Sequence, residues 1–181
     1  QLAGSEVTPD LATDRDLERS LLDHECGIRG LALVISETSE RFAVRARAED
    51  KNLEVHHSGK LPAHGDAPRT GQSLAALLDN ALRFTPPGGT ITVEGRMTSK
   101  QVEATVTDTG PGIAPESLDR IFERFYRADA HSAARSRGPS GGTGLGLAIA
   151  RDLVRVQGGE VNAENTEGGG ARFRLTLPLG P

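Results

Sequence analysis

Three stretches of the chain carry apolar residues at the spacing of a buried helix face. They span about 31–49, 73–83 and 145–157, and apolar positions recur in each at i, i+3 and i+4, which predicts a helix. In the middle stretch these positions are Leu74, Leu77, Leu78 and Ala81. The run Pro86-Pro87-Gly88-Gly89 should end that helix, because proline lacks the N–H that a helix needs.

Alternating β-branched and polar residues predict five strands. The first, 52–57, follows the first helix, and the next two, 90–97 and 101–107, form a hairpin across three polar residues. The last two, 159–164 and 171–177, form a closing hairpin across three glycines. The order is therefore αβ, then αββ, then αββ. Long helices over a mixed, mostly antiparallel sheet predict an α/β protein built as a two-layer α/β sandwich.

The segments between these elements have weaker patterns. We expect residues 1–27 to be an N-terminal arm or the remnant of a preceding region, and residues 28–181 to form one folded domain. Prolines and glycines in 60–71 predict a connection, whereas 116–122 is predicted to be helical. Residues 127–142 contain almost no bulky apolar residue, and we expect a mobile loop there.

Composition narrows the classes of function. The net charge is −4 with both signs mixed, so no basic stripe predicts nucleic-acid binding. No apolar run reaches the ~20 residues of a membrane span, so we expect no direct membrane insertion by this chain. Cys26 is the single cysteine, which fits a reducing compartment. Because the chain begins with Gln1 and its one methionine is Met97, we expect a fragment of a larger protein.

A glycine-rich run precedes the third helix, with glycines at 141, 142, 144 and 146. Glycine lets backbone amides come close to a ligand, and the N-terminus of the following helix would present its amides and positive dipole end to an anion. The run therefore predicts a phosphate site. A flexible linker that happens to precede a helix is the alternative.

The second helix has a polar face as well as an apolar one. Ala76, Asn80, Arg83 and Phe84 are spaced by three and four residues, so they share a face away from the leucines. An amide oxygen can bind a hard cation, an arginine can bind phosphate, and a ring can stack on a base. The alternative is a solvated face whose terminal ring folds back onto the core.

Two further stretches carry candidate chemistry. Asp108 ends a predicted strand and is followed by Thr109-Gly110-Pro111-Gly112-Ile113, which places a carboxylate beside a backbone that a ligand can approach. A polar β-turn would have the same composition. The stretch Ile121 to Arg127 gathers three aromatic residues within five positions and would at least anchor the loop that follows.

Taken together and in this order, the four stretches resemble the ATP-binding catalytic domain of sensor histidine kinases, within the gyrase, Hsp90, histidine kinase and MutL class of ATPases. Residues 77–85 resemble the N box, 108–113 the G1 box, 121–127 the F box and 142–146 the G2 box. The match covers about 31–181. It implies a Bergerat-type sandwich with a mobile ATP lid between the last two boxes.

The resemblance also implies roles for individual residues. Asn80 would bind Mg²⁺, and Arg83 and Arg127 would reach the ATP phosphates, which makes these three the expected catalytic residues. Phe84 would pack on the adenine and Asp108 would accept its amino group. The full set expected to contact ATP is Asn80, Arg83, Phe84, Asp108, Gly110, Gly112, Ile113, Tyr126, Thr143, Gly144, Leu145 and Gly146.

One position departs from the pattern of the family. Four residues before Asn80, many histidine kinases have a second asparagine and hydrolytic relatives have a glutamate, but this chain has Ala76. Alanine cannot act as a general base, which argues against fast ATP hydrolysis and is compatible with transfer to an acceptor that brings its own base.

The resemblance implies partners that the chain itself lacks. A histidine kinase needs an acceptor histidine on a dimerisation hairpin, and the stretch between His24 and Asn80 is too short to hold that hairpin plus a helix and a strand. We therefore expect the hairpin elsewhere on the same or a separate polypeptide, a response regulator downstream, and a cytoplasmic location with a parent kinase that can be membrane-anchored. The alternatives are a serine kinase of the anti-sigma-factor type and a non-catalytic nucleotide-sensing module.

Overall fold

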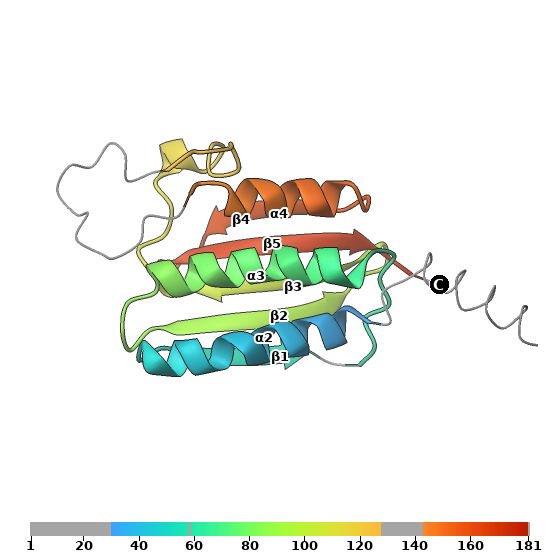
Figure 1. Cartoon of the computed structure of the whole chain (residues 1–181), viewed down its shortest axis with the longest axis horizontal. Coiled ribbons are helices and arrows are strands. Elements are labelled where there is room, and N and C mark those ends of the chain that lie inside the picture. The colour runs from blue at the N-terminus through green and yellow to red at the C-terminus, as the bar shows by residue number, and fades with distance from the viewer. Residues whose placement is uncertain (1–29, 58, 128–142, 181) are drawn as a thin grey trace, which may run out of the picture.

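The structure of the protein is a computed structural model that describes residues 30–57, 59–127 and 143–180. It consists of a five-stranded sheet with helices on one face (Figure 1). The strands are β1 (Asn52–His57), β2 (Thr90–Met97), β3 (Gln101–Asp108), β4 (Glu160–Asn165) and β5 (Ala171–Pro178). Their order in the sheet is β1-β2-β3-β5-β4. Only the β1–β2 pair is parallel among these strands, so the predicted mixed and mostly antiparallel sheet is confirmed.

Three α-helices cover the sheet in the described part of the chain: α2 (Leu31–Ala48), α3 (Ala67–Phe84) and α4 (Gly146–Arg155). Figure 1 shows them side by side on one face, with α3 between the other two. The two-layer α/β sandwich is therefore confirmed. The predicted arm at 1–27 lies outside the described residues, as do the predicted lid at 128–142 and all of the predicted loop at 127–142 except Arg127.

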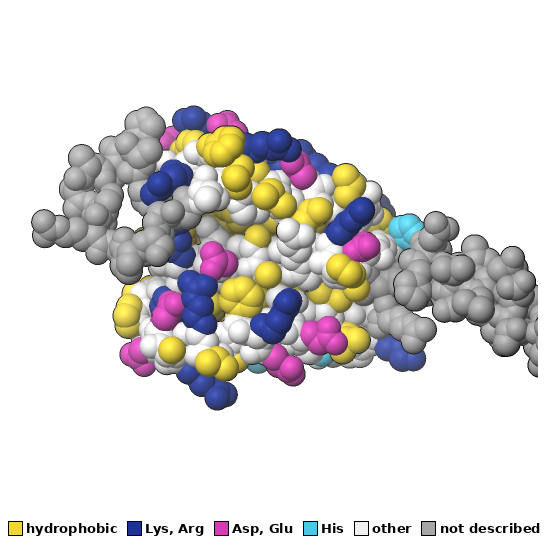
Figure 2. Space-filling model, in the orientation of Figure 1, with side chains coloured by type: hydrophobic (Ala, Val, Ile, Leu, Met, Phe, Trp, Pro, Cys, Tyr) yellow, Lys and Arg dark blue, Asp and Glu magenta, His cyan; other side chains and the backbone are white. Residues whose placement is uncertain are grey.

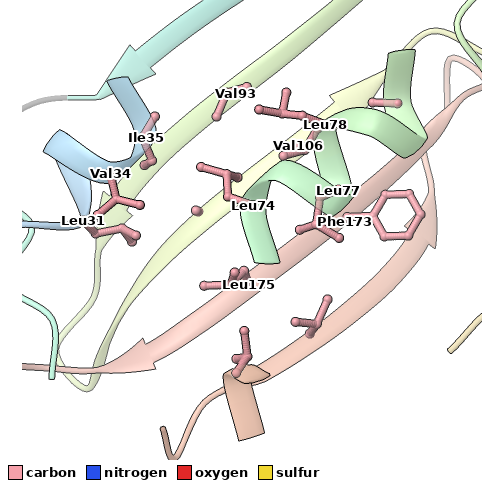
Figure 3. Packing of buried hydrophobic residues seen from close by; sticks show 14 of the residues in the cluster. Leu31, Val34, Ile35, Leu74, Leu77, Leu78, Val93, Val106, Phe173 and Leu175 are labelled. Atoms are coloured by element: carbon pink, nitrogen blue, oxygen red, sulfur yellow. The ribbon is translucent and has the colours of Figure 1, made fainter. Parts of the chain in front are cut away.

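The core lies between the two layers and is mainly aliphatic. Figure 3 shows side chains from α2 and α3 meeting side chains from the central strands. The largest fully buried ones include Leu31, Ile35, Leu74, Leu77, Leu78, Val93, Phe173 and Leu175. The leucines of α3 are the apolar face that the sequence predicts, so its opposite side near the C-terminal end is left for other contacts.

Helix α3 begins six residues earlier than predicted, and the expected connection over 60–71 is wrong in its second half. Asp66 caps the helix, because its Oδ1 accepts a hydrogen bond from the N–H of Arg69 at 2.7 Å. Pro68 lies in the first turn, where a helix has no use for the missing N–H. The proline therefore belongs to the start of the helix and does not mark a break before it.

The helix predicted over 116–122 is also wrong. A short 3₁₀-helix, η1 (Pro115–Ser117), is followed by turns up to Phe125. In these turns Phe122 points inward and is buried, and Tyr126 bonds to Ser117 through its hydroxyl at 2.9 Å. The segment is therefore held in place by the buried ring of Phe122 and the hydroxyl of Tyr126, and not by the main-chain hydrogen bonds of a regular α-helix.

Charges of both signs are interspersed on the helical side of the molecule, as Figure 2 shows. The other side of the sheet is polar, with ion pairs between neighbouring strands such as Arg96–Glu103 at 2.7 Å and Arg174–Glu164 at 3.4 Å. This face needs no covering layer, because its side chains bond to one another and to solvent.

Candidate nucleotide-binding site

A cavity of about 600 Å³ opens between the C-terminal half of α3 and the start of α4. The turn after β3 and the segment 121–127 complete its walls. Eleven of the residues that the sequence singles out line it: Asn80, Arg83, Phe84, Asp108, Gly112, Ile113, Tyr126, Arg127, Thr143, Gly144 and Gly146. Four stretches that are far apart in the sequence therefore meet around one space of the size that a nucleotide needs.

Two predicted contact residues lie just behind this lining. The N–H of Gly110 donates to Oδ1 of Asp108 at 2.8 Å, and a Cβ at position 110 would lie 2.7 Å from the carbonyl oxygen of Phe84. Leu145 precedes the first turn of α4, and its carbonyl accepts the N–H of Ile149 at 2.9 Å. Both residues position the lining and do not form it.

Asp108 is the buried acidic group of the cavity, with 3% of its surface exposed. Its Oδ1 accepts hydrogen bonds from the N–H groups of Gly110 at 2.8 Å and Ala171 at 3.3 Å. Burial raises the pKa of the carboxyl above its ordinary value of 3.8, and these two bonds only partly oppose that shift. Among the described residues, Oδ2 accepts no hydrogen bond, so it is available to a donor on a ligand.

The polar face of α3 lines the cavity. The side-chain amide of Asn80 has no hydrogen bond within the part of the chain that the structure describes, and Ala76 lies one turn before it. The guanidinium of Arg83 lies 5.2 Å from the centroid of the Phe84 ring, which is 40% exposed. The neighbouring Asp79 bonds to Arg45 of α2 at 2.5 Å, so its charge is already paired.

The start of α4 forms the opposite wall. Gly144 has a φ of 72°, and a Cβ there would lie 2.8 Å from the carbonyl carbon of Phe125. The carbonyl of Gly144 accepts the N–H of Phe125 at 2.9 Å. Across the cavity, a Cβ at Gly146 would lie 4.0 Å from the Cβ of Ala76. The first turn of α4, whose amides have no partners within the helix, therefore lies close to α3 at Gly146.

The segment 121–127 is attached to α4 and the sheet by several side chains. Phe122 packs edge-on against Phe173 of β5, with centroids 6.5 Å apart, and Phe173 lines the cavity. The Arg151 guanidinium lies 4.8 Å from the centroid of the Phe122 ring. On the surface, Arg124 pairs with Asp152 of α4 at 2.9 Å.

Some residues of this site were not found by sequence reasoning. Phe173 and Ala171 of β5 lie in the cavity, and Asn165 of β4 bonds to the turn that forms one wall. Their positions follow from the pairing of β5 between β3 and β4, which local patterns in the sequence do not give. Asn165 directly follows the strand predicted at 159–164 and precedes the glycine turn, and this place near a turn was the one available signal.

A metal ion would have few protein ligands here. Within the described ranges, no three His, Cys, Asp or Glu side chains lie close enough together to hold one. The free amide oxygen of Asn80, together with phosphate oxygens from a nucleotide, fits the hard oxygen ligands that Mg²⁺ prefers. The site thus fits a metal that arrives with a nucleotide.

The fold is that of a two-layer α/β sandwich, and its cavity has the size that a nucleotide needs. Residues 65–181 match the family described as histidine kinase-, DNA gyrase B-, and HSP90-like ATPase. The chain belongs to this family.

Two relatives of the chain are named as sensor kinases. The sensor-like histidine kinase SenX3 of Mycobacterium tuberculosis is 37% identical over 145 residues, which is 80% of this chain and 34% of SenX3. The adaptive-response sensory kinase SasA of Trichormus variabilis is 34% identical over 169 residues, 92% of this chain and 40% of SasA. The chain thus spans well under half the length of these two relatives.

Solved structures of histidine kinases share the fold. The mycobacterial sensor histidine kinase MprB has a TM-score of 0.69 at 31% identity, over 83% of this chain and 95% of that structure. The catalytic domain of histidine kinase ThkA has a TM-score of 0.71 at 27% identity, over 84% and 96%. Among the described residues, no helix is long and apolar enough to span a membrane.

Proposed function

We propose that this chain is the ATP-binding catalytic module of a two-component sensor histidine kinase. It binds ATP and transfers the γ-phosphoryl group to a histidine on a dimerisation hairpin of the same or a separate polypeptide, from which a response regulator receives it. The observation that carries the proposal is the meeting of four motif stretches around one cavity of about 600 Å³. Family membership and the histidine kinases among its relatives support it.

The base end of the nucleotide belongs at the turn after β3. The free Oδ2 of Asp108 accepts a hydrogen bond from the exocyclic amino group of adenine, and Phe84 and Ile113 supply apolar contacts to the base. The absence of a side chain at Gly112 lets the base approach the backbone. The buried carboxylate thus gives selectivity for adenine over bases that present an acceptor there.

The phosphate end belongs between α3 and the start of α4. Arg83 and Arg127 neutralise phosphate charge. The N–H groups of Gly144 and Gly146, which have no acceptor among the described residues, hold phosphate oxygens. Asn80 would hold Mg²⁺, which supplies charge neutralisation to the phosphates when bound. Phosphoryl transfer depends mainly on such positioning and charge stabilisation, so the protein needs no covalent step of its own.

Specific residues distinguish this proposal from two alternatives. A serine kinase of the anti-sigma-factor type would use a related single domain, but the segment 121–127 and its contacts with α4 favour the histidine kinase. A non-catalytic nucleotide sensor is favoured only by Ala76, which leaves one position of the phosphate region without a polar group.

Transfer to a hairpin tests the proposal. The chain is incubated with γ-labelled ATP, Mg²⁺ and the dimerisation hairpin encoded with it or taken from a related kinase. We expect little label on the chain alone, and label on the hairpin that is lost in acid and kept in base, as for phosphohistidine. Label that survives acid indicates the serine kinase, and nucleotide binding without transfer to any hairpin indicates the sensor.

The Mg²⁺ assignment is tested at Asn80. Asn80→Ala should abolish the gain in ADP affinity that Mg²⁺ gives, while affinity in EDTA changes little. Gln72→Ala, at an exposed position of the same helix, serves as the matched control. Unchanged Mg²⁺ dependence in Asn80→Ala contradicts the assignment.

A further inference from the structure

Asn165, the last residue of β4, bonds through its side chain to the main chain of Ile113 in the turn after β3. Its Oδ1 accepts the N–H of Ile113 at 2.7 Å, and its Nδ2 donates to the carbonyl of Ile113 at 2.7 Å. The amide thus pairs with Ile113 as a neighbouring strand would. Turning the amide over would oppose donor to donor and acceptor to acceptor, so the orientation is fixed by chemistry.

The same contact explains a glycine of the turn. Gly112 has a φ of 75°, and a Cβ there would lie 2.8 Å from Oδ1 of Asn165 and 3.3 Å from the carbonyl oxygen of Gly170. A side chain at position 112 would therefore push Asn165 away from Ile113. Glycine at position 112 therefore leaves room for the side chain of Asn165, in addition to lining the cavity.

Few hydrogen bonds hold this part of the turn, although the side chain of Ile113 also packs against the hydrophobic core. Gly110 is tied to Asp108, and the carbonyl of Ala114 accepts the N–H of Ser117 at 2.8 Å. Between them, at 111–113, the hydrogen bonds among described residues are the two to Asn165. Gly112 and Ile113 both line the cavity. The wall that they form is therefore set by a residue that lies outside the cavity lining and outside the four motif stretches.

We infer that Asn165 is a positioning residue for the nucleotide base. It holds the Gly112–Ile113 wall at the distance from Phe84 and Asp108 that adenine requires, without touching the nucleotide itself. The inference rests on the proposed function of the cavity. Because the wall lies at the base end, Asn165 acts on the base and leaves the Mg²⁺ and phosphate end unaffected.

Two substitutions separate the parts of this contact. Asn165→Ala removes both hydrogen bonds. Asn165→Asp keeps the shape and the acceptor but places a carboxylate oxygen against the carbonyl of Ile113. Asn162→Ala is the matched control, since Asn162 lies on the same strand, is exposed and makes no side-chain hydrogen bond among described residues.

The first measurement is amide hydrogen exchange of the chain without nucleotide. The Ile113 amide should exchange at least tenfold faster in Asn165→Ala than in the wild type and in Asn162→Ala. It should stay protected in Asn165→Asp, which keeps the acceptor. Equal exchange in all four proteins overturns the inference without any reference to nucleotide.

The second measurement is ADP affinity with Mg²⁺ and with EDTA. We expect both Asn165 variants to lose about tenfold in affinity, the scale of one or two lost hydrogen bonds, and by the same factor in both conditions. A general loss of folding would lower the melting temperature, which should stay within a few degrees of that of Asn162→Ala. An affinity within twofold of Asn162→Ala, or a loss confined to the Mg²⁺ condition, overturns the inference. If wild-type protein binds no ADP, the proposed function fails instead, and the exchange data still judge the contact.

Discussion

The guanidinium of Arg151 covers the ring of Phe122, with Cζ 4.8 Å from the centroid and Nη2 donating to the Phe122 carbonyl at 3.2 Å. Phe122 in turn meets Phe173, which lines the cavity. Helix α4 therefore holds the segment 121–127 through a cation on one aromatic ring, and that ring supports the wall of the cavity.

Arg151→Met should lower the free energy of unfolding by about 1–2 kcal/mol, the sum of a cation–π contact and a hydrogen bond. Arg155→Met on the same helix should cost less than about 0.5 kcal/mol, because its pairing with Glu160 is on the surface. Urea unfolding of the two variants compares these values directly. A cost at Arg151 no larger than at Arg155 contradicts the role given to the ring contact.

Asp108→Asn should weaken ADP binding at least tenfold while leaving the protein no less stable. The new amide can still accept from Gly110 and Ala171, but its NH₂ would face the adenine amino group. Because burial raises the pKa of Asp108, removing the charge should not lower the melting temperature at pH 7. Calorimetric binding and thermal unfolding give the two values, and a binding loss that comes with a fall in melting temperature would point to misfolding.

Nucleotide affinity should depend on pH through the same carboxyl. Its pKa lies above 3.8 in the fold, so protonation favours the fold: this stabilisation is full below pH 3.8 and is lost as the pH rises through the raised pKa. Binding needs the ionised form, so ADP affinity should fall as the pH drops through that same pKa. Asp108→Asn should lack this inflection, whereas titration of ADP itself would appear in both proteins.

Gly144→Ala should destabilise the protein by about 1–2 kcal/mol and weaken ADP binding. A Cβ would lie 2.8 Å from the Phe125 backbone, and the φ of 72° is unfavourable for alanine. Gly168→Ala is the control, because a Cβ there meets nothing within 4 Å and no positive φ is required. Thermal unfolding should separate the two variants by several degrees, and equal melting temperatures would contradict the close approach of Gly144 to Phe125.

Ala76→Asn should strengthen Mg²⁺-dependent ADP binding several-fold. A longer polar side chain there lies one turn from Asn80 and opposite Gly146, where it can reach a phosphate or a metal-bound water. ADP affinity with Mg²⁺ and with EDTA checks this. A gain in EDTA alone would contradict a contact made through the metal, and a loss in both conditions would show that the alanine is required for packing against α4.

Features that depend on short-range patterns could be predicted from the sequence. The apolar stripe of α3 and the alternation in the strands predict most elements. Residue type and place in a motif single out Asp108 and Asn80, both of which line the cavity. The start of α3 was missed because proline and glycine were interpreted as breaks, although the Asp66 cap makes Pro68 compatible with a first turn.

Contacts between distant strands could not be predicted. Asn165 meets Ile113 only because β5 pairs with both β3 and β4, so the two residues are brought together by the order of the sheet. The absence of a regular α-helix over 116–122 has a similar origin. Phe122 is drawn to Phe173 and Arg151, and Phe125 takes a φ of 65°, neither of which a local pattern encodes.

Helix α3 carries the core leucines on one side and Asn80, Arg83 and Phe84 on the other. A ligand that immobilises those three side chains therefore also restrains α3, the middle helix of the domain. Its effect would extend as reduced motion into α2, which contributes nothing to the lining but lies beside α3. Occupancy of the cavity and the rigidity of α2 are therefore coupled, because both depend on how firmly α3 is held.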